Sequence, residues 1–399
     1  MEQNVHEISI PHGTLSIVGM KGCEELVASI DQYLSEWRKE RHGGLTQNTD
    51  FIGYCRDSYQ LKVDCPRFGT GEAKAISHES FRGQDLFILV DVFNYSVKYK
   101  MYGTEVPMSP DDHFADLKRI IAAASGKAKR INVIMPMLYE GRQHKRTARE
   151  SLDCALCLQE LVAMGVDNIL TFDAHDARVQ NAIPLSSFEN IMPTYQFLKA
   201  MVRTIDDFNI DKEHLMIISP DEGALNRSMY YSSVLGVNLG MFYKRRDYST
   251  VIDGRNPIVA HEFLGESVEG KDLIIVDDMI ASGDSVMDIA KKLKDQGAKR
   301  VFVATTFGLF TAGLEVFDKA YEDGYIERVF TTNLIYRKPE LADRKWYTEV
   351  NMAKYIAYFI DTLNHDQSVS GLLNPVHRIN KLLDKKAKGE IKVVSPKKK

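Results

Sequence analysis

The feature that most constrains the fold is a short stretch near residue 280, where an apolar run meets two acids and a glycine-containing loop. Residues 273–276 are Leu-Ile-Ile-Val, Asp277 and Asp278 follow, and the loop 282–285 leads into apolar residues at helical spacing. Gly297 is the expected end of that helix, and the next apolar run, 301–305, predicts another strand. The stretch therefore predicts a strand, a loop, a helix and a second strand of an α/β sheet.

The same loop has the chemistry of a phosphate site with a sugar site beside it. The backbone N–H groups of 282–285 and the helix N-terminus favour a phosphate dianion. Asp277 and Asp278 can accept hydrogen bonds from vicinal ribose hydroxyls. An ordinary capped strand-to-helix turn is the alternative reading. Two adjacent acids at the end of a buried strand are costly unless something binds them, so the stretch indicates a ligand of the ribose 5-phosphate type.

The same order of strand, helix and strand occurs twice along the chain, which predicts two α/β domains. In the first copy, strands at 131–137 and 166–171 flank a helix at 152–164. The second copy has strands at 215–219 and 237–243 around a helix at 224–235. Such alternation implies parallel sheets covered on both faces, which bind ligands at the carboxyl ends of their strands. The polar clusters expected there are 142–143, 173–175, 221–223, 244–246 and 277–278.

Length and composition limit the class of protein. The chain of 399 residues is 44% apolar and 27% charged, which is typical of a globular protein with two domains. Its net charge of −4 disfavours nucleic acid as a partner, and it has neither an apolar run of membrane-spanning length nor a signal-like N-terminus. Five scattered cysteines favour a reducing, cytoplasmic location. Cys154 and Cys157 are expected to be structural thiols, and 381–399 a disordered basic tail.

Two further clusters carry candidate chemistry. Asp173 and His175 alternate along a segment expected to be extended, so both would face one side and could hold Mg²⁺ beside a polyphosphate. A structural histidine bonded to its neighbour is an equal alternative. Lys244 and Arg246 share one face of a strand, which suits the charge of a transferring phosphoryl group; a solvated basic loop is the other reading.

Three other segments lie outside the strands and helices of these two repeats. The loop 142–149 carries four cations and could close over an anionic substrate. Residues 37–59 and 102–111 are polar or rich in turn residues, and they are expected to be surface insertions.

With these residues in view, the chain resembles the ribose-phosphate pyrophosphokinase family in order through most of its length. The matching segments are 67–72, 80–88, 142–149, 173–175, 219–227, 244–246, 277–285, 350–352 and 366–370. The chain departs from the family pattern at Ala281, where an acid is usual, and at His144, where Asp is common. It also reads Asp284 and Ser285 where the family has Gly-Thr.

The resemblance implies an α/β fold of two tandem phosphoribosyltransferase-like domains, at 1–194 and 195–349, followed by a closing helix at 350–373 and a basic extension at 374–399. It implies transfer of the β,γ-diphosphoryl group of ATP to the C1 hydroxyl of ribose 5-phosphate, giving phosphoribosyl pyrophosphate and AMP. Mg²⁺ is the implied cofactor. Because the family's adenine site is often shared between subunits, a homo-oligomer built from dimers is implied, with a hexamer as one form.

The family's functional residues carry over to matching positions of this sequence. The implied catalytic residues are Lys244 and Arg246. ATP is expected to contact Phe68, Thr70, Glu72, Arg142, Gln143 and His175. Ribose 5-phosphate is expected to contact Asp221, Asp277, Asp278, Ala281, Ser282, Gly283, Asp284 and Ser285. The expected metal contacts are His175, Asp173 and Asp221.

Two other functions share parts of this pattern. A phosphoribosyltransferase would use phosphoribosyl pyrophosphate as substrate, but one such domain would normally suffice. A non-catalytic regulatory homologue of the synthetase is the second alternative. The presence of His175, Lys244 and Arg246 argues against it, whereas Ala281 argues slightly for it.

Overall fold

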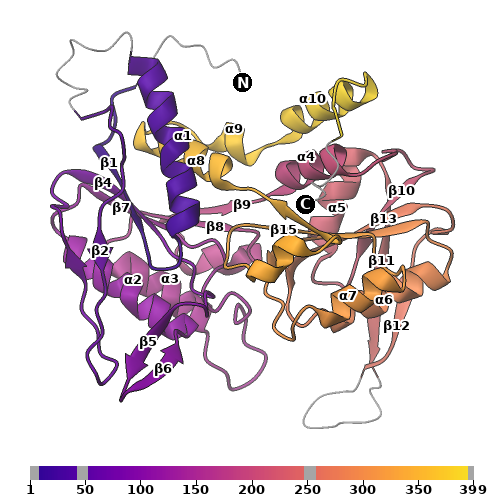
Figure 1. The fold of residues 1–399 in the computed structure, drawn as a ribbon, viewed down its shortest axis with the longest axis horizontal. Coiled ribbons are helices and arrows are strands. Elements are labelled where there is room, and N and C mark those ends of the chain that lie inside the picture. Colours follow the sequence, from indigo (N-terminus) through magenta and orange to yellow (C-terminus); the bar gives the residue numbers. More distant parts are fainter. Residues whose placement is uncertain (1–8, 43–52, 247–257, 394–399) are drawn as a thin grey trace. The chain divides into compact units, whose positions relative to one another are not determined.

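The computed structural model describes residues 9–42, 53–246 and 258–393. The chain divides into two compact units, each built around its own sheet (Figure 1). The N-terminal unit comprises 1–192, 334–336 and 351–374, and the C-terminal unit comprises 193–333, 337–350 and 375–399. Within the described residues, every helix is too short or too polar to cross a bilayer.

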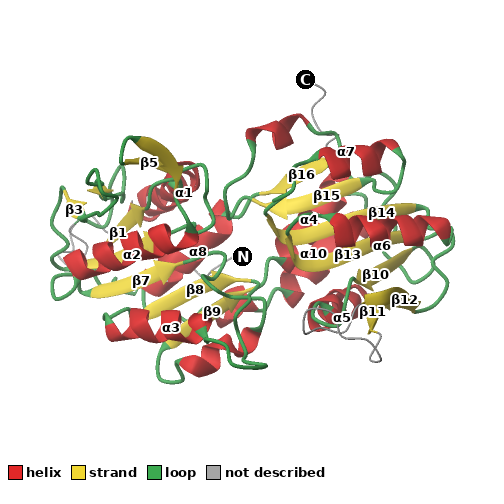
Figure 2. Cartoon of the chain, turned by 90° about the horizontal axis from the view of Figure 1, so that it is seen from below, coloured by secondary structure: helices red, strands yellow, loops and turns green. Residues whose placement is uncertain are grey.

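The N-terminal unit has a five-stranded parallel sheet in the order β1-β4-β7-β8-β9. Its strands are β1 (Thr14–Gly19), β4 (Gln84–Leu89), β7 (Arg130–Ile134), β8 (Asn168–Phe172) and β9 (Ser187–Ile191). The helices are α1 (Glu24–His42), α2 (Pro110–Ala124), α3 (Asp153–Ala163), α8 (Ala353–Asn364) and the short α9 (Ser370–Leu373). Helices α1 and α8 pack together on one face, and α2 and α3 cover the other (Figures 1 and 2). Cys154 and Cys157 are buried on α3, as expected for structural thiols.

A buried polar network fixes α8 against the start of the chain. The guanidinium of Arg38, 1% exposed, donates to Asn364 Oδ1 at 2.6 Å and lies 3.3 Å from Asp361. Asn364 in turn donates to the fully buried Asp85 at 2.8 Å, and Arg130 lies 2.7 Å from the same carboxylate. Because buried charges are costly without partners, this unit requires residues from both ends of the described chain.

The two segments expected to be insertions differ in structure. Residues 102–111 contribute to the antiparallel hairpin of β5 (Lys98–Met101) and β6 (Thr104–Pro107), and then to the start of α2. Residues 37–42 belong to α1, and Tyr54 and Tyr59 are buried, so these parts of 37–59 are not a surface excursion. Residues 43–52 lie outside the described part of the chain.

The C-terminal unit has a seven-stranded sheet in the order β12-β11-β10-β13-β14-β15-β16, parallel except for the pair β11 and β12. Its strands are β10 (Leu215–Ser219), β11 (Asn238–Arg246), β12 (Ile258–Leu264), β13 (Asp272–Ile280), β14 (Arg300–Gly308), β15 (Arg328–Thr332) and β16 (Tyr347–Val350). The helices are α4 (Thr194–Thr204), α5 (Leu225–Leu235), α6 (Asp284–Asp295), α7 (Glu315–Glu322) and α10 (Val376–Ala387). The repeated strands and helices predicted from the sequence are confirmed in both units.

The end of β11 leaves the body of the sheet. Its pairing with β10 stops at Met241, while its pairing with β12 runs from Met241 to Arg246. The register shifts between Arg245 and Arg246. The last residues of β11, Lys244 and Arg246 among them, therefore belong to a two-stranded antiparallel ribbon.

The basic C-terminal segment was expected to be disordered, but much of its described part is a helix. Residues 376–387 form α10, which packs on α4 and buries Ile379 and Leu382. The Arg378 guanidinium lies 5.4 Å from the Tyr195 ring centroid. Apolar residues at helical spacing among the lysines explain the helix, and residues 394–399 lie outside the described part.

Candidate active site

The loop between β13 and α6 has a backbone that only glycine fits well. Gly283 has φ of 100°, a left-handed conformation. A Cβ atom at this position would lie 2.4 Å from Cζ of Phe317, which is fully buried. The loop therefore runs close over α7 and then turns into α6, whose first residue is Asp284. The predicted strand–loop–helix is confirmed, and it presents the amino end of α6 to the cavity beside the loop.

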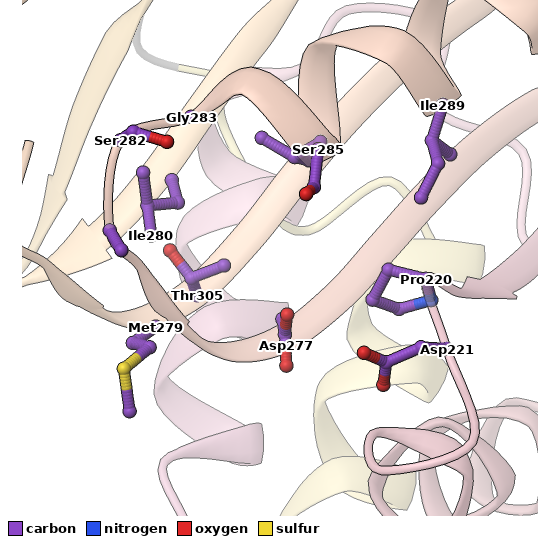
Figure 3. A pocket seen from close by; sticks show the side chains of 12 residues that line it. Pro220, Asp221, Asp277, Met279, Ile280, Ser282, Gly283, Ser285, Ile289 and Thr305 are labelled. Carbon is purple, nitrogen blue, oxygen red and sulfur yellow. The ribbon is translucent and has the colours of Figure 1, made fainter. Parts of the chain in front are cut away.

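That cavity has a volume of about 180 Å³ and lies at the carboxyl ends of β10 and β13 (Figure 3). Its wall is formed by Pro220, Asp221, Asp277, Met279, Ile280, Ala281, Ser282, Gly283, Ser285, Val286, Ile289 and Thr305. Most residues predicted to contact ribose 5-phosphate thus surround one space. Asp278 and Asp284 do not line it.

The sequence predicted that the adjacent acids Asp277 and Asp278 follow the end of a strand. In the structure they lie within β13, because the strand continues to Ile280. Of the two acids, Asp277 lines the cavity, whereas Asp278 is buried and does not line it. Burial and the neighbouring Asp278 carboxyl raise the pKa of Asp277 well above its usual value, while Arg227, 3.6 Å away, opposes that shift. Perturbed carboxyls of this kind are typical of binding sites.

The second carboxylate of the cavity comes from the turn after β10. One oxygen of Asp221 accepts hydrogen bonds from the backbone N–H groups of Gly223 and Ala224, at 2.9 and 3.2 Å. Ser219 Oγ donates to the Asp221 carbonyl at 2.8 Å. These bonds fix the turn, and Figure 3 shows the Asp221 carboxylate directed toward Asp277.

The segment 173–175 differs from its expected form. Asp173 has φ of 41° and is buried, whereas His175 is exposed. The chain turns directly after β8, so the extended geometry that would place both side chains on one side is wrong. Among the described residues, no group of three or more His, Cys, Asp or Glu side chains is arranged to hold a metal ion.

The loop after β7 brings His144 beside His175, a pairing that the sequence analysis did not foresee. The two ring centroids are 5.4 Å apart, and His144 Nε2 lies 3.4 Å from Asp176. Hydrogen bonds from Arg178 hold the pKa of Asp176 well below its usual range. Residues from two segments separate in the sequence thus form one polar cluster, which comprises His144, His175, Asp176 and Arg178.

The remaining expected ATP contacts lie in a tight turn that ends near Glu72. The Phe68 N–H donates to the Glu72 carbonyl at 2.7 Å, and Thr70 Oγ1 donates to the Glu72 carboxylate at 2.9 Å. The Phe68 ring is 53% exposed, so it is available to stack on a planar ligand. The side chains of Lys244 and Arg246 lie outside the described part of the structure, although their backbones are in β11.

Thr305, which the sequence did not predict, also lines the cavity. Thr305 lies on β14 in register with Asp277 on β13. Nothing in the local sequence marks it, because its position follows from strand pairing.

Comparison with known proteins identifies the same two halves. A model of the N-terminal domain of ribose phosphate pyrophosphokinase matches residues 15–165, and a phosphoribosyl transferase domain model matches residues 186–342. The ribose-phosphate pyrophosphokinase of Vibrio cholerae is 28% identical over 313 residues, which cover 77% of this chain and 90% of that protein. The Mycoplasma pneumoniae enzyme of the same name is 31% identical over 272 residues, covering 67% of this chain and 74% of that protein.

A solved structure shows the same fold. The phosphoribosylpyrophosphate synthetase of Mycobacterium smegmatis aligns with a TM-score of 0.67 and 21% identity, covering 88% of this chain and 99% of that one. The two matched domains, the relatives and the cavity at the β13–α6 loop agree with one another. The chain belongs to the ribose-phosphate pyrophosphokinase family.

Proposed function

We propose that this protein transfers the β,γ-diphosphoryl group of ATP to the C1 hydroxyl of ribose 5-phosphate, giving phosphoribosyl pyrophosphate and AMP. The observation that carries the proposal is the cavity beside the β13–α6 loop, which is lined both by a phosphate-type loop and by the two carboxylates Asp221 and Asp277. The relatives that carry the name ribose-phosphate pyrophosphokinase support the same reaction.

The sugar phosphate occupies this cavity in the proposal. Its 5-phosphate accepts hydrogen bonds from the backbone N–H groups of 282–285 and from the hydroxyls of Ser282 and Ser285. The positive end of the α6 dipole adds to that attraction. The ribose hydroxyls donate to Asp277 and Asp221, which lie on the other side of the same space.

ATP is assigned to the side chains of the N-terminal unit. Its adenine stacks on the exposed Phe68 and contacts Arg142 and Gln143, while Thr70 and Glu72 complete the turn that carries Phe68. We infer that this site is shared between copies of the chain, so the enzyme is a homo-oligomer built from dimers. A cytoplasmic location, where ATP and ribose 5-phosphate are both present, follows from the proposal.

Mg²⁺ is the proposed cofactor, and the carboxylates of the C-terminal unit fit it. Mg²⁺ prefers oxygen ligands and binds proteins through one or two carboxylates together with substrate phosphates. Asp221 and Asp277 line one cavity, and a cation there would favour the ionised form of Asp277, whose pKa is raised by burial and by the Asp278 carboxyl. When bound, the ion neutralises charge on the transferring group. In the N-terminal unit, the exposed His175 is the proposed contact, whereas Asp173 is buried.

Chemistry in this proposal is an in-line displacement at the β-phosphorus. The C1 oxygen of the sugar forms the new bond, the bond from the β-phosphorus to the α,β-bridging oxygen breaks, and AMP leaves. The hydroxyl proton passes to solvent. Lys244 and Arg246 neutralise the negative charge that accumulates around the β-phosphorus.

We predict that Lys244→Ala lowers kcat by about two to three orders of magnitude with little change in ATP affinity, because the ammonium acts mainly in the transition state. AMP formation and calorimetric titration with ATP measure the two quantities. Lys271→Ala, a lysine outside the cavity, is the matched control. An unchanged kcat in Lys244→Ala would overturn this role.

The deciding experiment measures AMP release from ATP with Mg²⁺, in the presence and absence of ribose 5-phosphate. AMP that forms only with ribose 5-phosphate, without ADP, establishes diphosphoryl transfer. Absence of AMP together with tight binding of phosphoribosyl pyrophosphate would instead support a phosphoribosyltransferase. Tight ATP binding without any turnover would support a regulatory homologue in which Ala281 has removed the activity.

A further inference from the structure

The N-terminal unit contains a second cavity, of about 500 Å³, formed by none of the residues assigned above. It lies at the carboxyl end of β1, next to a segment that runs parallel to β1 through a bridge between Ile17 and Gln60. Ligands of open α/β sheets bind at this edge. The volume falls within the range of about 300–1,000 Å³ that is usual for small-molecule sites.

The floor of this cavity is apolar and well packed. Met20, Leu61, Met108 and Ile120 line it, and each is less than a tenth exposed. These side chains come from the end of β1, the parallel segment, the residue after β6 and α2. A ligand that fills the cavity would therefore bury an aromatic ring or an aliphatic chain of similar size.

One buried polar side chain of the lining has an unused hydrogen-bond acceptor. His113 is 1% exposed, and its Nε2 lies 2.9 Å from the carbonyl oxygen of Asn94. A carbonyl can only accept, so Nε2 carries the proton; burial lowers the pKa of His113 and keeps the ring neutral. Nδ1 is then an acceptor, and no described residue donates to it. A ligand with an O–H or N–H group would satisfy it.

Two lysines of the rim carry charge that a ligand could pair with. Lys21 and Lys62 both line the cavity, and within the described ranges neither ammonium has an ion-pair partner. The acids of the lining have other partners. Glu24 accepts from the Gly22 N–H, Glu79 accepts from the backbone N–H of Lys62 at 3.5 Å, Asp64 lies 2.6 Å from His78, and Asp116 lies 2.7 Å from Arg67. An anionic group on a ligand would pair with the two lysines.

We propose that this cavity binds a small organic phosphate or carboxylate that has an apolar ring or chain and one O–H or N–H donor. Its anionic group lies between Lys21 and Lys62, its apolar part covers Met20, Met108 and Ile120, and its donor reaches His113 Nδ1.

The same cavity shares a residue with the turn that carries Phe68. Arg67 lines the cavity, lies 2.7 Å from the buried Asp116 and stacks over Tyr99 at 4.8 Å. It also donates to the Gly71 carbonyl at 3.4 Å, and the Tyr102 N–H of the β5–β6 hairpin donates to Gly69 at 2.8 Å. A ligand in the cavity would therefore change the position of the turn 67–72. This coupling rests on the proposed role of that turn in ATP binding.

Binding is tested by calorimetry on the full chain with 4-hydroxyphenyl phosphate, which has a ring, a donor and a dianion. We expect saturable binding that ribose 5-phosphate and ATP do not displace. The affinity of 4-methoxyphenyl phosphate, which lacks the donor, should be about tenfold weaker, the loss of one buried hydrogen bond. Lack of binding at millimolar concentration, or displacement by ribose 5-phosphate, would overturn the site.

A matched pair of variants tests the lysines. The double variant Lys21→Gln/Lys62→Gln should weaken probe binding at least tenfold. The control Lys74→Gln/Lys100→Gln removes the same charge from exposed positions outside the lining and should leave binding unchanged. Equal weakening in both variants would show a general charge effect and overturn the proposal.

Coupling to the turn is measured separately from binding. In the AMP assay, saturating probe should change the KM for ATP at least twofold while the KM for ribose 5-phosphate stays constant. Probe binding without that change would overturn the coupling. If the chain makes no AMP at all, the proposed function fails, while calorimetry still reports on the cavity.

Discussion

At the scale of single residues, Gly283 decides the shape of the ribose-phosphate loop. Its left-handed backbone is costly for any other residue, and its Cα lies against Phe317. The Phe317 ring cannot move aside easily, because it packs against Phe310 and Trp346 at centroid distances of 5.0 and 5.3 Å. A side chain at 283 would therefore displace the loop and its N–H groups.

We predict that Gly283→Ala raises the KM for ribose 5-phosphate at least tenfold, with a smaller change in the KM for ATP. The left-handed conformation costs alanine about 1–2 kcal/mol, and the contact with Phe317 adds to it. Gly324→Ala is the control, since Gly324 has φ of 73° but open space at its Cβ position. Similar KM values for ribose 5-phosphate in both variants would contradict the argument.

Residues that line the cavity were predictable where they belong to one continuous segment of the sequence. Asp277, Ser282, Gly283 and Ser285 follow from a strand, a loop and a helix that adjoin in the sequence. Asp173 was misplaced, because a single left-handed residue after β8 cannot be read from the alternation of side chains. Asp278 was also assigned to the ligand, but it is buried and does not line the cavity.

At the scale of elements, α10 shows how apolar residues at helical spacing outweigh a high content of lysine. The helix buries Ile379 and Leu382 against the C-terminal unit, and Lys386 lies 5.8 Å from the Phe208 ring. Lys381 and Lys385 are exposed to solvent. Net charge alone therefore predicted disorder where the arrangement of apolar residues produces a packed helix.

Removing α10 should destabilise the C-terminal unit. We predict that truncation after Asn374 lowers the free energy of unfolding of this unit by about 3–6 kcal/mol, the effect of two buried aliphatic side chains. Truncation after Gly389, which retains α10, should leave stability unchanged. Urea denaturation followed by circular dichroism compares the two, and equal midpoints would show that α10 adds no stability.

At the scale of the whole molecule, the chain returns to its N-terminal unit after completing most of the C-terminal one. The repeated pattern of strands and helices predicted two sheets, because each repeat is local. It could not predict that α8 completes the first unit, since the bonds from Asn364 to Arg38 and Asp85 span hundreds of residues. Long-range partners of this kind leave no periodic signal in the sequence.

The N-terminal unit should therefore not fold from its continuous part alone. We predict that a fragment of residues 1–192 lacks a cooperative thermal transition, because Arg38 would lose its buried partners at a cost of about 3–5 kcal/mol. Joining residues 351–374 to that fragment through a flexible linker should restore the transition. Circular dichroism melting measures both, and a cooperative transition in the shorter fragment would refute the prediction.

The ribbon at the end of β11 has a consequence for the fate of ATP between turnovers. Among the described residues, β11 beyond Met241 pairs with β12 alone, and an isolated pair of strands is only marginally stable in water. Opening this ribbon therefore costs less free energy than unfolding the sheet. We expect the ribbon to be held in one position only when sugar phosphate and nucleotide are both bound. Bound ATP is then protected from attack by water until the sugar hydroxyl is present to receive the diphosphoryl group.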